Sequence, residues 1–296
     1  MITKLSTVVE EEEVMELLLF IWGIVVGTVF STVGAAGGIL AGFGHISLFG
    51  INVANSVKVM NQILVIISTL ISVPTYWKQG RLIFILGGLL GIGSVIGAIV
   101  GSTLSYTYLS GLKAYKFLFG IFTLIVAFKV FHDVFVKERE RVKSIDKDLK
   151  EGKERRVKVL KRSMKEVEFS FLGKKYSFNP ILPVLAGFVV AVISSALGVG
   201  GGFLLVPFMV SVLKVPMYLV PGTSAFAVLI TTTISMLNYI KLGAVVYWKV
   251  IFAEALGVIV GSFIGPHISH ILGERRLRLL LGFILLGIGL KYIFIR

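Results

Sequence analysis

The stretch SALGVGGGFLLVP, from Ser195 to Pro207, interrupts a long apolar run with four glycines in five residues and a proline. A glycine inside a helix costs about 1 kcal/mol relative to alanine, and a proline costs about 3 kcal/mol. A continuous helix through this stretch is therefore unfavourable, and the sequence predicts two helical segments separated by a break. At membrane depth, such a break is tolerated only where it is buried in protein or lines a cavity.

The composition of the whole chain is that of a membrane protein. Of its 296 residues, 56% are hydrophobic, and the mean hydropathy is +0.92. A helix that crosses a bilayer needs about 20 apolar residues. In hydrocarbon the backbone must be paired within helices or closed barrels, and the ten-residue alternation of barrel strands is absent. The sequence predicts an all-α polytopic membrane protein. Its eight long apolar runs cover roughly residues 15–43, 52–74, 82–105, 113–135, 180–206, 218–240, 247–270 and 277–295.

The two halves of the chain repeat each other. GAAGG at residues 34–38 aligns with GVGGG at residues 198–202 at an offset of 198 − 34 = 164, and YWKQG at Tyr76 aligns with YIKLG at Tyr239 at 163. These matches predict two homologous four-helix repeats, with the first helix of each repeat broken at its glycine-rich stretch. If this first run doubled back completely, each half would have five crossings and the repeats would be inverted. The predicted repeats are residues 1–136 and 178–296.

A charged segment, residues 137–177, joins the two repeats. It holds fifteen of the thirty Lys and Arg and eight of the sixteen Asp and Glu, so its net charge is 15 − 8 = +7. Between membrane spans, such an excess indicates a cytoplasmic loop rather than binding to nucleic acid. With eight spans, both termini would lie on the same, cytoplasmic side. The sequence predicts a multi-pass protein of the cell membrane.

Two local patterns occur within this loop. Val157, Leu160, Met164 and Val167 recur at helical spacing among basic residues, which predicts an amphipathic helix. The sequence EFSFLGKKYSF then alternates aromatic and polar residues around Gly173, which predicts a short hairpin. A solvated linker without fixed structure is the alternative for both.

The glycine-rich breaks are the predicted binding site. Freed amides at the start of a half-helix bind anionic groups, a common arrangement in secondary transporters. The two breaks lie at similar depth in their spans, so they are expected to face each other around one site. Close helix packing is the alternative, although packing uses spaced glycines, as at 93, 97 and 101 and at 257, 261 and 265. The candidate binding glycines are Gly34, Gly37, Gly38, Gly198, Gly200, Gly201 and Gly202.

Four further side chains are candidates for the anion site. Thr223 and Ser224 follow Pro221, which suits the first turn of a helix, so their hydroxyls lie beside free amides. An ordinary cap is the alternative for both, and hydroxyls in membrane helices also bond their own backbone. Asn61 stands at the equivalent place in the first half, and Lys58 precedes it. Lys58 either supplies positive charge to a bound anion or extends to the membrane interface.

Glu254 is the acidic residue that lies well inside a predicted span, which marks it as a candidate for carrying a coupled proton. The alternative is a position near the interface, where it would pair with Lys249. His45 follows the first break and is a weaker site candidate. The chain has no cysteine and no metalloprotease, nucleotide-binding or hydrolase motif, so the sequence predicts no metal site, no cofactor and no enzyme activity.

The chain resembles the sulfite exporter TauE/SafE family over nearly its whole length apart from the loop 137–177, with the more specific motifs in the second half. The resemblance is carried by SALGVGGGFLLVPFMV, by VPGTSAFAVLITTTISMLNYIKLGAV, by the helix with glycine at every fourth position and by RRLRLLLGFILLGIGLKYI. It implies transport of sulfite or small organosulfonates. Together with the breaks, it predicts a secondary transporter of a small sulfur-containing oxyanion that works by alternating access.

The expected partners are the anion and the bilayer, with no nucleic acid, and a homo-oligomer is left open. Two other classes remain as alternatives. One is a membrane scaffold or sensor that works through the charged loop. The other is an intramembrane enzyme that uses Glu254 and the histidines.

Overall fold

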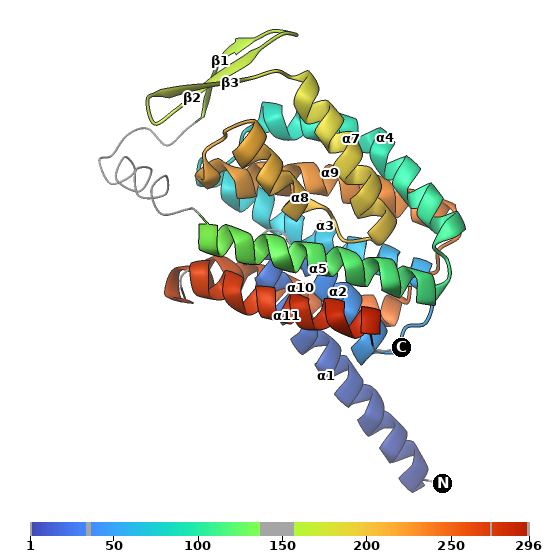
Figure 1. Cartoon of the computed structure of the whole chain (residues 1–296). Coiled ribbons are helices and arrows are strands. Elements are labelled where there is room, and N and C mark those ends of the chain that lie inside the picture. Colours follow the sequence, from blue (N-terminus) through green and yellow to red (C-terminus); the bar gives the residue numbers. More distant parts are fainter. Residues whose placement is uncertain (1, 34–36, 137–156, 273, 295–296) are drawn as a thin grey trace.

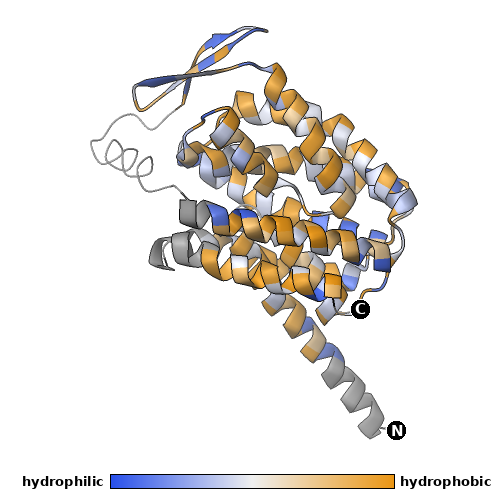
Figure 2. Cartoon of the chain, viewed as in Figure 1, coloured by the Kyte–Doolittle hydropathy of each residue, from blue (hydrophilic) through white to orange (hydrophobic). Residues whose placement is uncertain are grey.

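The computed structural model describes residues 2–33, 37–136, 157–272 and 274–294, and it is a bundle of helices with one small sheet (Figure 1). Within these residues, six helices are long and apolar enough to cross a membrane, which supports a polytopic membrane protein. Figure 2 shows the apolar residues spread over all of them. The six spans are Glu12–Ser31, Ala54–Lys78, Phe84–Tyr108, Leu112–His132, Met217–Lys241 and Trp248–Gly265. The shorter apolar helices are Gly37–Leu48, Ile181–Leu197, Gly202–Val212 and Leu279–Phe294.

The first apolar run of each half contains two helical segments. In the first half, α1 is followed by α2 and by the π-helix η1. In the second half, α7 is followed by α8 and by the π-helix η2. The bounds are α1 Ile2–Val33, α2 Gly37–Phe43, η1 Gly44–Leu48, α7 Ile181–Leu197, α8 Gly202–Pro207 and η2 Phe208–Val212.

The segment α2–η1 runs back along α1. A Cβ atom on Gly37 would lie against Phe30, and one on Gly44 would lie against Trp22. Later positions of α2–η1 therefore contact earlier positions of α1, and the two segments are antiparallel. The run therefore doubles back after the break. In the first half, this agrees with the five-segment alternative rather than with a single broken span.

The remaining helices of the two halves run in opposite directions. The side chain of Gln62 in α3 bonds Ser235 in α9, while Tyr76 at the far end of α3 lies beside Gly222 at the start of α9. Thus α3 and α9 are antiparallel. The same holds for α5 and α11, because Gly120 faces Tyr292 and Gly282 faces Phe131. The bounds are α3 Ala54–Lys78, α4 Phe84–Tyr108, α5 Leu112–Val136, α9 Val220–Lys241, α10 Trp248–Leu272 and α11 Glu274–Phe294.

Spaced glycines join the first helix of each half to the third helix of the other. Gly93 of α4 lies against the backbone of Val184 and Phe188 in α7, and Gly261 of α10 lies against Ile24 and Thr28 in α1. A side chain at either glycine would meet backbone atoms, so these positions need small residues for the helices to approach. The predicted glycine contact faces are confirmed at these positions.

In Figure 1 the N-terminal end of α1 and the C-terminal end of α11 both lie toward the lower right, and the sheet lies at the upper left. That the termini and the charged loop share a side of the membrane stays a prediction, which assumes four crossings in each half. The returning segment α2–η1 adds a reversal to the first half and favours opposite sides.

The charged loop ends in a three-stranded antiparallel sheet of β1 (Lys158–Arg162), β2 (Val167–Phe171) and β3 (Lys174–Phe178). A two-residue turn joins β2 to β3, with positive φ at Leu172 and Gly173 (50° and 76°), as tight hairpins require. The sheet lies where the aromatic alternation predicts a hairpin. The amphipathic helix predicted from Val157 to Val167 is wrong, because this segment forms β1, a turn and the start of β2. Residues 137–156 lie outside the described residues.

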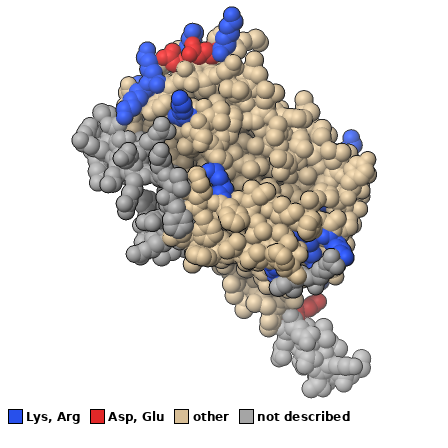
Figure 3. All heavy atoms as spheres, in the orientation of Figure 1, with Lys and Arg blue, Asp and Glu red and all other residues tan. Residues whose placement is uncertain are grey.

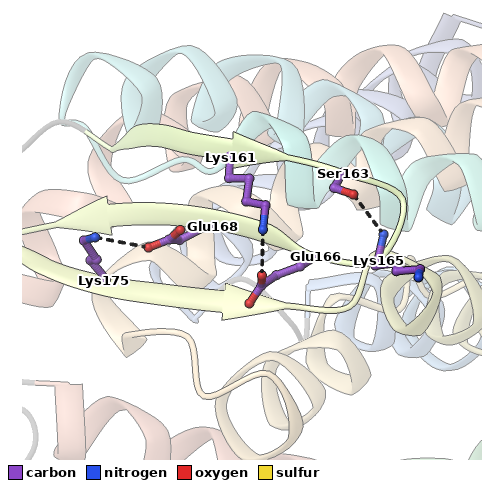
Figure 4. Close-up of polar contacts among 6 residues, drawn as sticks. All are labelled: Lys161, Ser163, Lys165, Glu166, Glu168 and Lys175. Atoms are coloured by element: carbon purple, nitrogen blue, oxygen red, sulfur yellow. Dashed lines mark hydrogen bonds and ion pairs between the residues drawn. The ribbon is translucent and has the colours of Figure 1, made fainter.

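The two faces of the sheet explain why it forms. Alternate residues of β2 are buried, and Phe171 stacks on Tyr218 with their ring centroids 5.7 Å apart. The opposite face carries charges, with Lys161 beside Glu166 at 3.4 Å and Lys175 beside Glu168 at 3.6 Å (Figure 4). Figure 3 shows charged side chains gathered at this end, while few appear on the middle of the face in view. Burial of every second residue of β2 against the membrane helices therefore determines a strand in this segment, despite the helical spacing of its four apolar residues.

Candidate functional site

The two glycine-rich breaks touch each other. A Cβ atom on Gly38 would lie 2.5 Å from the carbonyl oxygen of Val199 and 2.9 Å from its carbonyl carbon. The backbone of α2 therefore approaches the backbone of the second break directly. Gly37, Gly38 and residues 198–202 are all buried, and Gly34 lies outside the described residues. The structure thus brings the described candidate glycines of both halves to one place.

Left-handed glycines shape the second break. Gly198 ends α7 with φ +70°, and Gly201 precedes α8 with φ +75°. A side chain is strained in this region of backbone space. A Cβ atom on Gly198 would also lie 2.7 Å from the Cα atom of Lys58, so α3 packs directly on the break. Both the backbone conformation and the close approach therefore require glycine at Gly198.

Three hydroxyl groups bind backbone carbonyls at the end of α7. Tyr239 donates to the carbonyl oxygen of Ser195 at 3.0 Å, Ser105 to that of Ala196 at 2.6 Å, and Tyr115 to that of Leu197 at 2.8 Å. The last turn of a helix leaves such carbonyls without intrahelical donors. The donors come from α9, α4 and α5, so three other helices hold the carbonyl side of the break in place.

The amide side of the break has different neighbours. Because α8 begins at Gly202, its first amides precede any intrahelical acceptor. Polar side chains that the sequence analysis did not single out lie nearby. Gln62 donates to Ser235 at 2.8 Å, and Gly200 packs against Thr232 on the same helix as Ser235. Gln62 lies one helical turn after Lys58 in an apolar span, and this spacing is a signal that could have identified it.

Equivalent positions in the two halves make the same hydrogen bonds. Tyr76 donates to the carbonyl oxygen of Ser31, as Tyr239 does to that of Ser195. The offsets are 239 − 76 = 163 and 195 − 31 = 164. The amide of Ile51 bonds the carbonyl of His45 at 2.8 Å, and the amide of Val215 bonds that of Met209 at 2.9 Å. The offset is again 164, and these bonds close η1 and η2 in the same way.

Lys58 is fully buried, so it does not extend to the interface as one alternative expected. Its Nζ atom donates to the carbonyl oxygen of Leu109 at 2.7 Å and to Oδ1 of Asn55 at 3.1 Å, and it lies 4.8 Å from the ring centroid of Tyr115. Leu109 caps the end of α4. A cation at the carbonyl end of a helix is stabilised by the helix dipole, and this side chain therefore joins α3 to α4 beside the second break.

The hydroxyls of Thr223 and Ser224 have partners within the protein. The hydroxyl of Thr223 accepts a hydrogen bond from the amide of Ile83 at 3.0 Å and donates one to the carbonyl of Leu219 at 2.7 Å. It therefore links the starts of α9 and α4. Ser224 donates to the carbonyl of Pro221 in its own helix at 3.0 Å. Both hydroxyls therefore bond carbonyls of the preceding turn of α9, as hydroxyls in membrane helices commonly do, and α9 has no side-chain cap.

Glu254 and His45 form a buried pair. Oε2 of Glu254 lies 2.7 Å from Nε2 of His45, and Nδ1 of the same ring lies 2.7 Å from Oδ1 of Asn61. All three side chains are 0% exposed. The alternative in which Glu254 pairs with Lys249 near the interface is wrong, because Glu254 is buried in the bundle while Lys249 is exposed. The contact between His45 and Glu254 spans 209 residues and leaves no local signal in the sequence.

Two polar atoms of this cluster, Asn61 Nδ2 and Glu254 Oε1, have no hydrogen-bond partner within the described residues. A buried polar atom left unpaired costs about 1–3 kcal/mol. The cluster therefore favours a small hydrogen-bonding occupant such as water. The described residues contain no group of three or more His, Asp or Glu that could hold a metal ion.

The chain matches known proteins over nearly its whole length. The profile of the family described as Sulfite exporter TauE/SafE matches residues 19–292. The chain is also 23% identical over 285 residues to the "Probable membrane transporter protein YunE" of Bacillus subtilis (strain 168), covering 94% of this chain and 97% of that protein. No solved structure matches it. The chain therefore belongs to the sulfite exporter TauE/SafE family, whose members are membrane transporters and not enzymes.

Proposed function

We propose that this protein is a secondary transporter of a small sulfur-containing oxyanion, either sulfite or an organosulfonate, and that it works by alternating access. The family match supports transport, and the description of the family as a sulfite exporter supports a sulfur oxyanion. The sequence has no nucleotide-binding motif, so the energy is expected to come from an ion gradient or from exchange.

The two halves of the chain, residues 1–136 and 178–296, act as inverted repeats in this proposal. The equivalent hydrogen bonds of Tyr76 and Tyr239, and the antiparallel direction of α3 and α9, support this relationship. Inverted repeats give a transporter two related arrangements, because each half can adopt the conformation of the other. Movement of one half relative to the other would then open the central site to each side in turn.

The observation that carries the proposal is the contact of Gly38 with Val199. It brings the two breaks together between the antiparallel helices α3 and α9. Amides at the start of α8 are suited to the oxygens of a small anion, and Gln62 and Ser235 add side-chain donors beside them. Lys58 packs its backbone against Gly198, and its ammonium group, which bonds the carbonyl of Leu109, would add positive charge to this part of the bundle. Thr223 and Ser224 lie at the start of α9, where Thr223 would act by positioning α4 through its bond to the amide of Ile83.

The basic loop is proposed to be cytoplasmic. Its fifteen Lys and Arg outweigh those at the other end of the bundle, and the positive-inside rule places such a short loop in the cytoplasm. Since the termini lie at the opposite end, they would face the outside of the cell.

Counterflow in proteoliposomes tests the proposal. Vesicles containing the purified protein are loaded with unlabelled sulfite, diluted into labelled sulfite and followed for transient uptake of label. Parallel vesicles use thiosulfate or a taurine-derived sulfonate. Uptake that depends on the loaded anion is expected. A scaffold or sensor would give the same trace as protein-free vesicles with every anion, and that outcome would overturn the proposal.

A further inference from the structure

We infer that His45 and Glu254 together form the site of a coupling proton, and that the pair holds one shared proton while the transporter is closed. This inference rests on the proposed function and names its coupling ion. It goes beyond an isolated Glu254, because the geometry makes the histidine an equal part of the site.

The hydrogen bonds determine the number of protons. In the orientation that the structure gives the Asn61 amide, Oδ1 faces Nδ1 of His45 at 2.7 Å, and because Oδ1 accepts, Nδ1 carries a hydrogen. Nε2 and Oε2 of Glu254 then lie 2.7 Å apart, and a hydrogen must lie between them. Whether that hydrogen is closer to the ring or to the carboxylate, the pair has one proton more than a neutral imidazole and a free carboxylate. Its net charge is zero.

Burial makes this proton necessary for the closed state. Both side chains are 0% exposed. Loss of the shared proton would leave a carboxylate charge in the bundle, and a second proton would leave an uncompensated cation. Either charge is strongly disfavoured without water. The pair therefore gains or loses its proton only when the surrounding helices admit water, which ties protonation to opening of the transporter.

The pair lies on the segment that also carries the first break. His45 is in η1, seven residues after Gly38, so the two are about 10 Å apart along the segment α2–η1. Glu254 is in α10 of the other half, and Asn61 is in α3. Movement of α2–η1 would displace the anion site and the proton site together. A π-helix inserted at this point is a frequent feature of functional sites.

Ionisable groups on the neighbouring elements have partners of their own. Lys58 of α3 donates to Leu109, and Tyr115 of α5 donates to Leu197. On α11, Lys291 lies over the ring of Phe43, and Tyr292 shares a hydrogen bond with Ser47. His45 and Glu254 are therefore left as the pair whose charges balance each other.

The second half lacks the pair. At the offset of 164, His45 corresponds to Met209 and Glu254 to Leu90, and both of these are fully buried. The same fold position therefore accepts an apolar pair in this protein. The double variant His45→Met with Glu254→Leu copies that arrangement, and replacing a buried ion pair by apolar residues is often neutral for stability. It removes the proton site without leaving a single buried charge.

The experiment compares two transport modes in proteoliposomes. The first is counterflow of labelled sulfite at equal pH on both sides, which requires alternating access but no net proton movement. The second is accumulation of labelled sulfite driven by a tenfold proton gradient. The variants are Glu254→Gln and the Met–Leu double variant. The control is Ser47→Ala, which removes a hydrogen bond between η1 and α11 but no proton carrier.

We expect the wild type and Ser47→Ala to accumulate sulfite up to tenfold with the gradient, as one proton per anion allows. Both proton-site variants should show no accumulation above the level without a gradient, while counterflow continues. Gradient-driven accumulation by the double variant would overturn the inference, and so would loss of counterflow and accumulation together in a variant that still elutes as folded protein. Absence of counterflow in the wild type would instead overturn the proposed transport function itself.

Discussion

Replacing Gly38 by alanine should separate the two breaks. The added methyl carbon would lie 2.5 Å from the carbonyl oxygen of Val199, 2.9 Å from its carbonyl carbon and 3.0 Å from its Cα atom. All three are backbone atoms, so no side-chain rotation relieves the contact. Because carbon atoms pack best at about 3.5–4.0 Å, the two segments must move apart by about 1 Å.

The size of the effect follows from the cost of overpacking. Inserting a methyl group into a packed interior typically costs about 1–3 kcal/mol. At about 1.4 kcal/mol per factor of ten, conformations in which the breaks touch should lose population by about 5- to 150-fold. If alternating access passes through that contact, exchange should slow by a factor in this range.

Gly88→Ala is the matched control. Gly88 lies in α4, where an added Cβ would have nothing within 4 Å. The helix should gain about 1 kcal/mol from the better helix former. This variant should therefore exchange like the wild type and unfold at an equal or higher temperature.

The assay measures initial counterflow of labelled sulfite for each variant at equal reconstituted protein, together with thermal unfolding in detergent. Gly38→Ala should slow exchange and lower the unfolding temperature, and Gly88→Ala should do neither. An exchange rate in Gly38→Ala within twofold of the wild type would refute the argument, because transport would then not depend on the approach of the breaks.

Other variants test the remaining roles. Thr223→Val should lower stability by about 1–2 kcal/mol through loss of the bond to the Ile83 amide, with sulfite affinity unchanged; a large loss of affinity by thermal shift would return Thr223 to the anion site. Tyr239→Phe and Tyr76→Phe should each cost about 1 kcal/mol of stability and add in the double variant, and calorimetry showing very unequal effects would contradict their equivalence. Because the chain has no cysteine, Met164→Cys and Ser110→Cys can be labelled with a membrane-impermeant maleimide. Met164→Cys should react in inside-out vesicles and Ser110→Cys in right-side-out vesicles, whereas labelling of both from one side would contradict the opposite placement of loop and termini.

Local features of the sequence were sufficient for the class of protein and the positions of the breaks. Hydropathy over about 20 residues reports the lipid environment directly, and glycine at 198 and 201 reports a backbone conformation that other residues rarely adopt. The repeat was also predicted from the sequence, because short motifs match at offsets of 163 and 164. The family resemblance was visible in motifs of the second half, and the family match covers residues 19–292.

The sheet shows where local periodicity was insufficient. Val157, Leu160, Met164 and Val167 have helical spacing, but Val167, Phe169 and Phe171 are buried in alternation beneath the sheet. Burial against the ends of the membrane helices gives the segment its period of two. The secondary-structure propensities of the loop residues carry no information about the ends of the membrane helices on which the sheet packs.

Only the tertiary structure decided the directions of the helices and the composition of the proton site. Whether the first run crosses once or doubles back depends on contacts such as Gly37 with Phe30 and Gly44 with Trp22, and these set the sides on which the loop and termini lie. His45 and Glu254 are far apart in the chain and meet because α10 packs on α1 next to the returning η1. A sequence pattern describes what each residue prefers, whereas pairing between distant helices depends on which surfaces fit together.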